Sequence, residues 1–260
     1  MNQSYWLNTY EDIRDGAAEY VVVQPIGSTE QHGPHLPVGT DSLITTSIIE
    51  KLEASLARER LPICFLPLLP YGKSNEHDNF PGTISLSLET LISVLRDVGR
   101  GCARAGFRKL IILNGHGGNH ETIDLMTREI RIQTGMGVFA VHPFLKIQPQ
   151  SGMNLSSEEA KFGIHAGEVE TSLLLRIRPD AVKTEAFKPE YPSLIARTRE
   201  IDFSERVPFG WVTEDVSTLG TIGDPTRASR ESGESLLDGI CASLVAVIRE
   251  ICSIQWKSGR

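Results

Sequence analysis

Four short apolar runs, separated by stretches with helical periodicity, constrain the fold of this chain more than any other feature. The runs span residues 20–26, 63–70, 109–114 and 137–144. None alternates apolar and polar residues, as a strand with one solvent-exposed face would, so each is expected to be a parallel strand covered on both faces. The two prolines within 63–70 predict an irregular far end for that strand.

Helical patterns fall between and after these runs. Apolar residues recur at helical spacing within 42–60, 88–102, 119–130 and 237–251. Strand–helix–strand alternation predicts a parallel sheet with right-handed crossovers. The length of 260 residues suits one large domain, so we interpret residues 1–260 as a single domain. Residues 180–230 show little periodicity and predict a loop-rich insertion with short strands, either a lid or an oligomer contact.

Composition excludes several classes of protein. The net charge of −7 and the lack of any Lys/Arg run argue against binding of nucleic acid. No apolar run approaches the ~20 residues that span a bilayer, and the first residues do not resemble a signal peptide. The four cysteines form no CxxC pair and are expected to be reduced core thiols. We therefore expect a cytoplasmic protein without a membrane or nucleic-acid partner.

Polar clusters follow the first three apolar runs directly. GSTEQHGPH (27–35) holds Glu30 and His32, YGKSNEHDNFPGT (71–83) holds Ser74 and His77, and NGHGGNHE (114–121) holds His116. In open α/β sheets, ligands bind beyond the carboxyl ends of the strands. The three loops are therefore expected to converge at one edge of the sheet and to form a binding site.

The residue types in these clusters indicate a metal site, with alternatives open at each position. Glu30 and His32 are two apart, so in an extended segment their side chains point the same way. Asp41 begins the next helix, where a mere helix cap would also fit. His116 lies past a buried strand between glycines and suits metal ligation. No GK[ST] follows those glycines, so a nucleotide-binding loop is not indicated.

A fourth cluster, GIHAGEVETSLLL (163–175), holds two carboxylates near a histidine. In a helix that starts near His165, His165 and Glu168 would share a face. Glu170 would lie on the apolar stripe, where a carboxylate needs a metal, a hydrogen bond or a cation. The residues alone leave open which glutamate reaches a metal.

Together these motifs resemble the creatininase (creatinine amidohydrolase) family. PIGSTEQHGPHLPVGTD (25–41), EHDNFPGT (76–83), LNGHGGN (113–119) and HAGEVETS (165–172) carry the resemblance, and IGDPT (222–226) is similar to a later family segment. The resemblance implies a three-layer α/β/α sandwich around a central, mainly parallel sheet, and a homohexamer. It also implies two divalent metal ions per chain, zinc with zinc or manganese, beside a bridging water.

The resemblance also implies roles for individual residues. Glu30 and His116 look like ligands of one metal, His32 like a ligand of the other, and Asp41 like the bridging carboxylate. In the creatinine-hydrolysing branch, an aromatic residue and a glutamate ligand follow the histidine that corresponds to His116. Glycines stand at both positions here, at 117 and 118. Glu168 is the expected replacement ligand, because other branches carry HAGE there, and Glu170 would then support the ligands without binding a metal.

The implied activity is that of an amidohydrolase, in which a metal-bridging hydroxide attacks an amide or cyclic amide C–N bond of a small molecule. His165 is the candidate proton donor, and Glu168 shares the catalytic centre. Ser74, His77 and Gly117 are expected to contact the substrate. Alternatives are a formamide deformylase, a peptidase of a cofactor precursor, a cyclic ketose or lactone hydrolase, and a non-catalytic metal-stabilised assembly protein. The tryptophan that closes the creatinine pocket is missing from residues 151–164, which does not favour creatinine as substrate.

Overall fold

A single parallel sheet forms the centre of the molecule. The computed structural model describes residues 1–144, 155–198, 200–201, 203, 207 and 209–255. The strands are β1 (Val21–Ile26), β2 (Ile63–Phe65), β3 (Lys109–Asn114) and β4 (Gly137–Val141), in the spatial order β2-β1-β3-β4. All neighbouring strands run parallel. The last residues of β1 and β3, Ile26 and Asn114, are paired, so the loops that follow both strands leave the sheet side by side.

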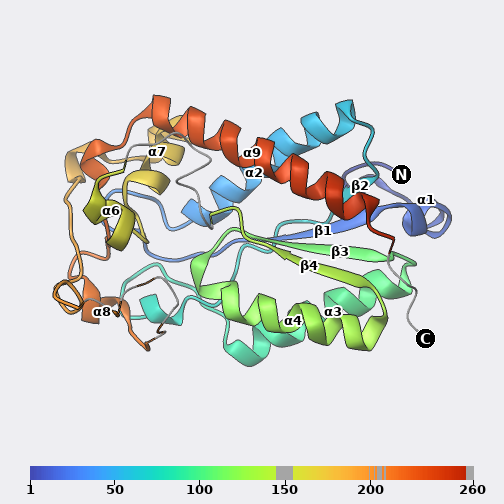
Figure 1. The fold of residues 1–260 in the computed structure, drawn as a ribbon, viewed down its shortest axis with the longest axis horizontal. Coiled ribbons are helices and arrows are strands. Elements are labelled where there is room, and N and C mark those ends of the chain that lie inside the picture. Colours follow the sequence, from blue (N-terminus) through green and yellow to red (C-terminus); the bar gives the residue numbers. More distant parts are fainter. Residues whose placement is uncertain (145–154, 199, 202, 204–206, 208, 256–260) are drawn as a thin grey trace.

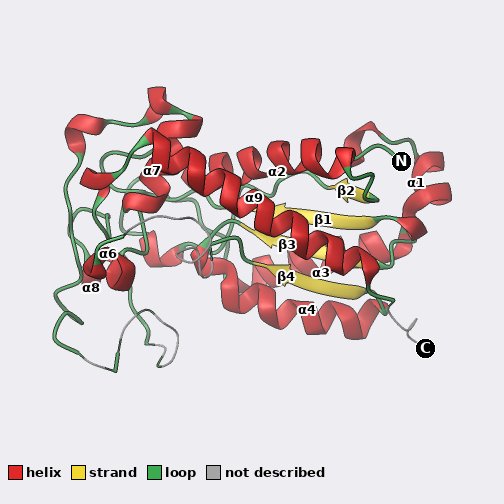
Figure 2. Ribbon diagram, turned by 45° about the horizontal axis from the view of Figure 1, so that its top comes forward, coloured by secondary structure: helices red, strands yellow, loops and turns green. Residues whose placement is uncertain are grey.

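Helices cover both faces of this sheet (Figures 1 and 2). The layer on one face consists of α2 (Thr40–Arg58), α7 (Glu168–Ile177) and α9 (Arg230–Ser253). The opposite layer consists of α1 (Tyr10–Gly16), α3 (Leu88–Arg104) and α4 (His120–Thr134). Two short helices, α6 (Ser157–Phe162) and α8 (Thr213–Val216), lie beyond the carboxyl ends of the strands. The three-layer α/β/α sandwich is thereby confirmed.

Each strand supplies alternate residues to the two layers. Val21 and Val23 of β1 pack with Ile111 of β3 against the helices of the α2 layer. Val22 of β1 and Ile112 of β3 pack into the opposite cluster. Side chains of a strand alternate between faces, so a strand buried on both faces must be apolar throughout. This is the physical reason why the four apolar runs predicted the sheet.

The second strand ends at Phe65, before Pro67 and Pro70, because proline cannot donate to the next hydrogen bond of a sheet, and this agrees with the irregular far end predicted for residues 63–70. The structure differs from the expectations in two other segments. The helix near His165 begins only at Glu168. The short strands expected in 180–230 are, among its described residues, short helical turns and isolated bridges such as Glu190↔Gly223.

Asn119 holds three of the loops beyond the sheet together. Its side-chain oxygen accepts the Lys73 N–H at 2.9 Å, and its amide nitrogen donates to the Gly27 carbonyl at 3.4 Å. Asn119 therefore joins the loops after β1, β2 and β3, which keeps their polar side chains at one place. In the described part of the chain, no helix is both long and apolar enough to cross a membrane.

Candidate metal centre

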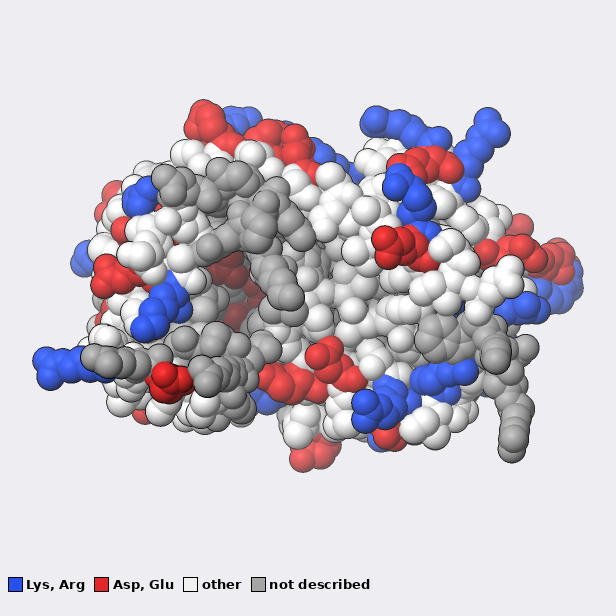
Figure 3. Space-filling view, in the orientation of Figure 1, with Lys and Arg blue, Asp and Glu red and all other residues white. Residues whose placement is uncertain are grey.

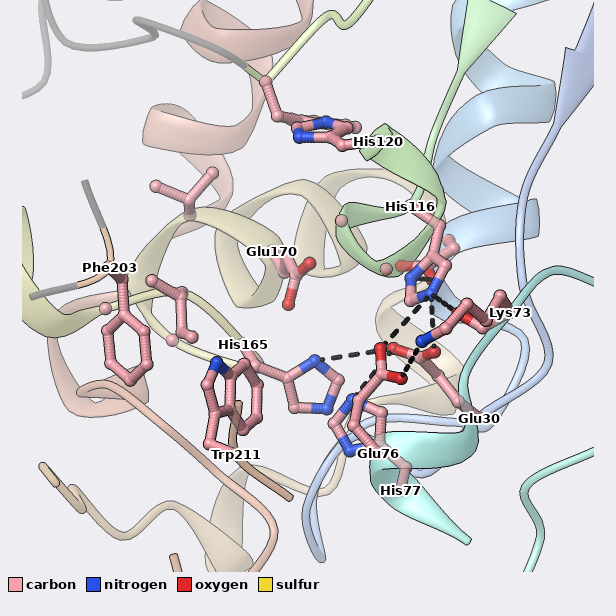
Figure 4. Close-up of a pocket in the computed structure, with 18 of the residues that line it drawn as sticks. Glu30, Lys73, Glu76, His77, His116, His120, His165, Glu170, Phe203 and Trp211 are labelled. Carbon is pink, nitrogen blue, oxygen red and sulfur yellow. Dashed lines mark hydrogen bonds and ion pairs between the residues drawn. The ribbon is translucent and has the colours of Figure 1, made fainter. Parts of the chain in front are cut away.

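Residues from three loops and two helices form one buried polar cluster at the carboxyl ends of the strands (Figure 4). Glu30 and His32 lie in the segment after β1, and Asp41 lies in the first turn of α2. His116 follows β3. All four side chains are almost completely shielded from solvent. Because α2 starts at this edge of the sheet, its first turn carries Asp41 into the same space as the strand-end loops.

The Asp41 carboxylate lies between two imidazoles. Its Oδ1 is 3.2 Å from His32 Nε2, and its Oδ2 is 3.0 Å from His116 Nδ1. Both contacts are ion-pair distances, but neither His32 Nε2 nor Asp41 Oδ2 makes a well-aligned hydrogen bond, although both atoms are buried. His32 Nδ1 faces the Glu30 carbonyl at 3.1 Å, so Nδ1–H can donate there and leave Nε2 free to coordinate. Buried donor atoms that lack a well-aligned hydrogen bond fit the binding of a cation.

Glu30 occupies the centre of a second group of contacts. Its Oε2 lies 3.2 Å from His116 Nε2 and accepts the Ser28 hydroxyl at 3.0 Å. Its Oε1 lies 3.5 Å from His77 Nε2 and 3.6 Å from His165 Nδ1. The carboxylate of Glu30 therefore touches three imidazoles from three different segments.

Three sets of side chains are close enough to hold an ion. They are Glu30 with Asp41 and His116, His32 with Asp41 and Glu170, and Glu30 with His32 and His165. The first two sets share Asp41, which fits a carboxylate that bridges two ions. Nitrogen and oxygen donors without thiolates suit Zn²⁺ or Mn²⁺.

Glu170, and not Glu168, reaches this cluster. Glu170 Oε2 lies 3.9 Å from His32 Nε2 and accepts the Ala166 N–H at 2.6 Å. The Glu168 carboxylate lies elsewhere, 4.0 Å from Arg227 Nε. Residues two apart on a helix point to different sides. Glu168 and Glu170 both lie in the first turn of α7, and Glu170 is the one directed at His32. The expectation that Glu168 supplies the fifth ligand therefore does not agree with the geometry.

The carboxylates dominate the electrostatics of the cluster. Burial disfavours a charge on His32 and His116, but the nearby carboxylates outweigh it and raise the pKa of each imidazole to about 10. Burial raises the pKa of Glu30 to about 7 and also raises the pKa of Glu170. The two imidazoles hold the pKa of Asp41 far below its usual value, against the effect of burial. In the absence of an ion, protons on the imidazoles balance the negative charge.

The pKa values of His165 and His77 are lowered, in contrast to those of His32 and His116. Burial and the neighbouring imidazoles lower the pKa of His77 to about 3 and that of His165 well below 6.5. Their rings stack with centroids 4.3 Å apart. His165 Nε2 lies 2.7 Å from the backbone carbonyl oxygen of Gln31, which can only accept a hydrogen bond. The ring proton therefore lies on Nε2, and the Nδ1 lone pair faces Glu30. His165 is neutral at pH 7, so it must take up a proton before it can donate one.

A pocket of about 900 Å³ opens over the cluster. His77, Gly117 and His165 line it, and Figure 3 shows acidic side chains in the depth of this hollow. Ser74 does not line the pocket, since it is fully buried and its hydroxyl lies 3.2 Å from His116 Nε2. Of the three residues expected to contact the substrate, His77 and Gly117 are therefore accessible from the pocket and Ser74 is not.

The two glycines after His116 have different surroundings. A Cβ at Gly117 would meet no atom within 4 Å. A Cβ at Gly118 would lie 2.2 Å from Glu76 Oε1, 2.5 Å from the Lys73 carbonyl and 2.7 Å from His116 Nε2. The Glu76 carboxylate, 4.0 Å from His116 Nε2, thus fills the space next to Gly118.

Several residues of the site were missed at the level of sequence. Gln31 stands between Glu30 and His32, and its side-chain amide donates to the Gly220 carbonyl at 3.0 Å. Glu76 directly precedes His77 in EHDNFPGT, and this position next to a candidate site residue could have indicated that Glu76 also lies in the site. Trp211 lines the pocket from the loop-rich insertion. Nothing in the spacing of residues 180–230 indicated that a tryptophan from there reaches the site.

A parallel α/β sheet that gathers carboxylates and imidazoles at the ends of its strands defines a class of protein whose site fits a metal-dependent hydrolase. Comparison with known proteins narrows this class. The family model Creatininase, described as creatinine amidohydrolase, matches residues 7–248. The chain belongs to the creatininase family.

Three curated relatives have different activities. The mycofactocin precursor peptide peptidase of Mycobacterium tuberculosis is 35% identical over 83% of this chain and 79% of its own length. The creatinine amidohydrolase of Pseudomonas putida is 30% identical over 92% of both chains. The 3-dehydro-scyllo-inosose hydrolase of Thermotoga maritima is 30% identical over 94% of this chain and 81% of its own length. The relatives are hydrolases, but they differ in the bond that they cleave.

Solved structures agree with this assignment. A crystal structure of creatinine amidohydrolase superposes with a TM-score of 0.75 at 27% identity, over 97% of this chain and 99% of that one. A putative creatinine amidohydrolase from Bacteroides fragilis superposes with a TM-score of 0.81 at 25% identity, over 99% of this chain and all of that one. The fold of the family therefore extends over nearly the whole chain.

Replacing Gly118 by alanine should displace His116 and weaken metal binding at least about tenfold, because the new Cβ would overlap the Lys73 carbonyl and His116 Nε2. Gly117→Ala is the matched control, since its Cβ has open space. Zinc affinity of the two variants, measured by competition with a chelator, checks this. Equal affinities would contradict the close approach at Gly118.

Metal binding should release protons and strengthen as pH rises. The pKa values of about 10 mean that His32 and His116 carry protons at pH 7 in the metal-free protein, and a divalent ion must displace them. Each released proton raises the apparent affinity about tenfold per pH unit. Calorimetry of Zn²⁺ binding in buffers of different ionisation enthalpy counts the protons. An affinity independent of pH between 6 and 8 would exclude the protonated imidazoles.

Proposed function

We propose that this protein is a dinuclear metal-dependent amidohydrolase that cleaves an amide or cyclic amide C–N bond. The observation that carries the proposal is the buried Asp41 carboxylate between His32 and His116, whose contacts at 3.2 and 3.0 Å leave Asp41 Oδ2 and His32 Nε2 without a well-aligned hydrogen bond. Glu30, Asp41 and His116 would hold one ion, and His32, Asp41 and Glu170 the other. Zinc, or zinc with manganese, suits these donors.

When bound, two divalent ions would supply Lewis-acid activation of the scissile carbonyl and lower the pKa of a water molecule. The residues of the chain divide the remaining tasks. His165 is neutral and presents its Nδ1 lone pair, so it can accept a proton near Glu30 and return it to the leaving nitrogen. The Gln31 carbonyl holds the ring of His165 in this tautomer.

The walls of the site fix the orientation of the imidazoles. His77 contacts Thr213 Oγ1 at 2.6 Å and the Gln31 amide nitrogen at 2.8 Å through Nδ1, so its ring orientation is fixed. Ser74 contacts His116 and thereby positions a ligand. We assign the contact with the substrate to His77 and to the open face of Gly117, which both line the pocket.

A second candidate function is hydrolysis of a peptide bond. A volume of about 900 Å³ is near the upper end of typical ligand pockets and admits more than a small cyclic amide. The peptidase relative is 35% identical to this chain. The same pair of ions could serve a formamide, a peptide, or a cyclic ketose or lactone, because the metals define the attack and the pocket defines the substrate. The homohexamer and the cytoplasmic location stay predictions, which light scattering and cell fractionation would test.

A panel of substrates on the metal-loaded protein tests the proposed reaction. Formamides, lactams, short peptides, lactones and cyclic ketoses would be incubated with the zinc- and manganese-loaded forms, and products followed by mass spectrometry. We expect turnover of at least one compound with a C–N bond, abolished by a chelator and restored by metal. Turnover of lactones or ketoses alone would refute amide hydrolysis, and no turnover at all with full metal occupancy would favour an assembly protein.

The assignment of the fifth ligand predicts a difference between two glutamates on one helix. Glu170→Gln should lose about one of the two ions, because its carboxylate reaches His32, and turnover should fall with it. Glu168→Gln should keep both ions, because its carboxylate faces Arg227. Metal analysis after dialysis without chelator decides the matter. Metal loss in Glu168→Gln alone would restore Glu168 as the ligand.

A further inference from the structure

Three aromatic side chains from the loop-rich insertion line the pocket above the metal centre. Phe203, Phe209 and Trp211 form this aromatic rim. The Phe203 and Phe209 rings lie 5.9 Å apart and nearly parallel, and the Phe203 and Trp211 rings lie 5.5 Å apart at 66°. Rings in these arrangements support one another, so the rim forms a connected surface of π faces and edges.

The rim is attached to the metal centre by a neighbouring residue. Thr213 is two residues beyond Trp211 and is buried. Its hydroxyl contacts the Glu76 carbonyl at 2.8 Å and His77 Nδ1 at 2.6 Å. The backbone N–H of Val212 donates to Asp215 at 2.9 Å, which starts α8. The two residues that follow Trp211 are therefore fixed at the wall of the site.

The pocket divides into a charged part and an apolar part. The carboxylates and imidazoles that line it come from the strand-end loops, from α2, α4, α6 and α7, and from His165 just before α7. In Figure 4, Glu30, His116 and Glu170 lie apart from Phe203, with Trp211 next to His165. Besides the aromatic rim, the apolar wall includes Phe144, Leu155, Ile164 and Val212. A substrate that fills both parts must carry a polar scissile group at one end and an apolar group at the other.

We propose that the aromatic rim binds a planar aromatic or heteroaromatic group of the substrate while the scissile bond lies at the metal centre. The inference rests on the proposed function, because it assumes that the reacting bond is bound at that centre. Offset-stacked or edge-to-face contacts with Trp211 favour a ring over an aliphatic group of the same size. Trp211 is then a residue that determines specificity, and it takes no part in the chemistry.

Matched chelating ligands test the proposal by binding, without any turnover. Hydroxamates chelate divalent ions, and phenyl and cyclohexyl hydroxamates with no, one or two methylene groups before the ring differ in planarity but little in size. Calorimetry on the zinc-loaded protein should show tighter binding of at least one phenyl ligand. In Trp211→Ala this ligand should bind about threefold to tenfold more weakly, which corresponds to one aromatic contact. Its cyclohexyl counterpart should change less than about twofold.

Two further variants complete the design. Trp211→Phe keeps an aromatic ring and should retain most of the preference for phenyl ligands. Trp6→Phe changes an exposed tryptophan of the N-terminal segment, outside the residues that line the pocket, and should change nothing. Equal losses for phenyl and cyclohexyl ligands in Trp211→Ala, or no loss for either, would overturn the aromatic rim while leaving the metal centre intact. Failure of every hydroxamate to bind the zinc-loaded protein would refute the metal centre and the rim's role in it together.

Discussion

The confinement of several carboxylates in a space largely shielded from solvent is the constraint on which the rest of this structure depends. Glu30 and Asp41 are buried, and Glu170 faces the same imidazoles. Like charges at such distances repel strongly in a medium of low dielectric constant, so the cluster requires positive charge. The raised pKa values of His32 and His116 express that requirement in protons. Two divalent ions would meet it more completely, since each brings two charges to the shared carboxylate.

A rigid support is needed to keep these groups together against their repulsion. The paired ends of β1 and β3 provide it, because both loops start from residues fixed by the sheet. The first turn of α2 adds Asp41, and Asn119 fastens three loops to one another. The free energy that keeps these loops in place thus comes from the apolar layers on either side of the sheet. Burial of apolar side chains in the two layers offsets the unfavourable free energy of gathering the polar cluster.

Much of this arrangement could be predicted from the sequence, and the exceptions have physical causes. Runs without polar alternation identified the parallel sheet, and polar residues after each run indicated where Glu30, His32 and His116 come together. Their role as ligands stays a prediction. Glu168 was preferred to Glu170 because family motifs say which residues recur, whereas the start of α7 decides which side chain points inward. The aromatic rim escaped notice because contacts of Trp211 depend on long-range folding of a segment without periodicity.

The separation between strand-end loops and insertion has a consequence for how such a protein can change over time. The candidate ion ligands are spread over positions that the sheet holds fixed, whereas the three residues of the aromatic rim lie close together in sequence, at 203, 209 and 211. With the rim binding the substrate as proposed, mutations of these three residues would alter which molecules are accepted without disturbing the buried charges. Thr213 contacts both His77 and the backbone of Glu76, so a substitution at Thr213 would disturb the polar cluster itself. On the proposed function, lineages with this scaffold would therefore acquire new substrates by exchanging a few aromatic side chains of the rim, with the buried polar cluster inherited unchanged.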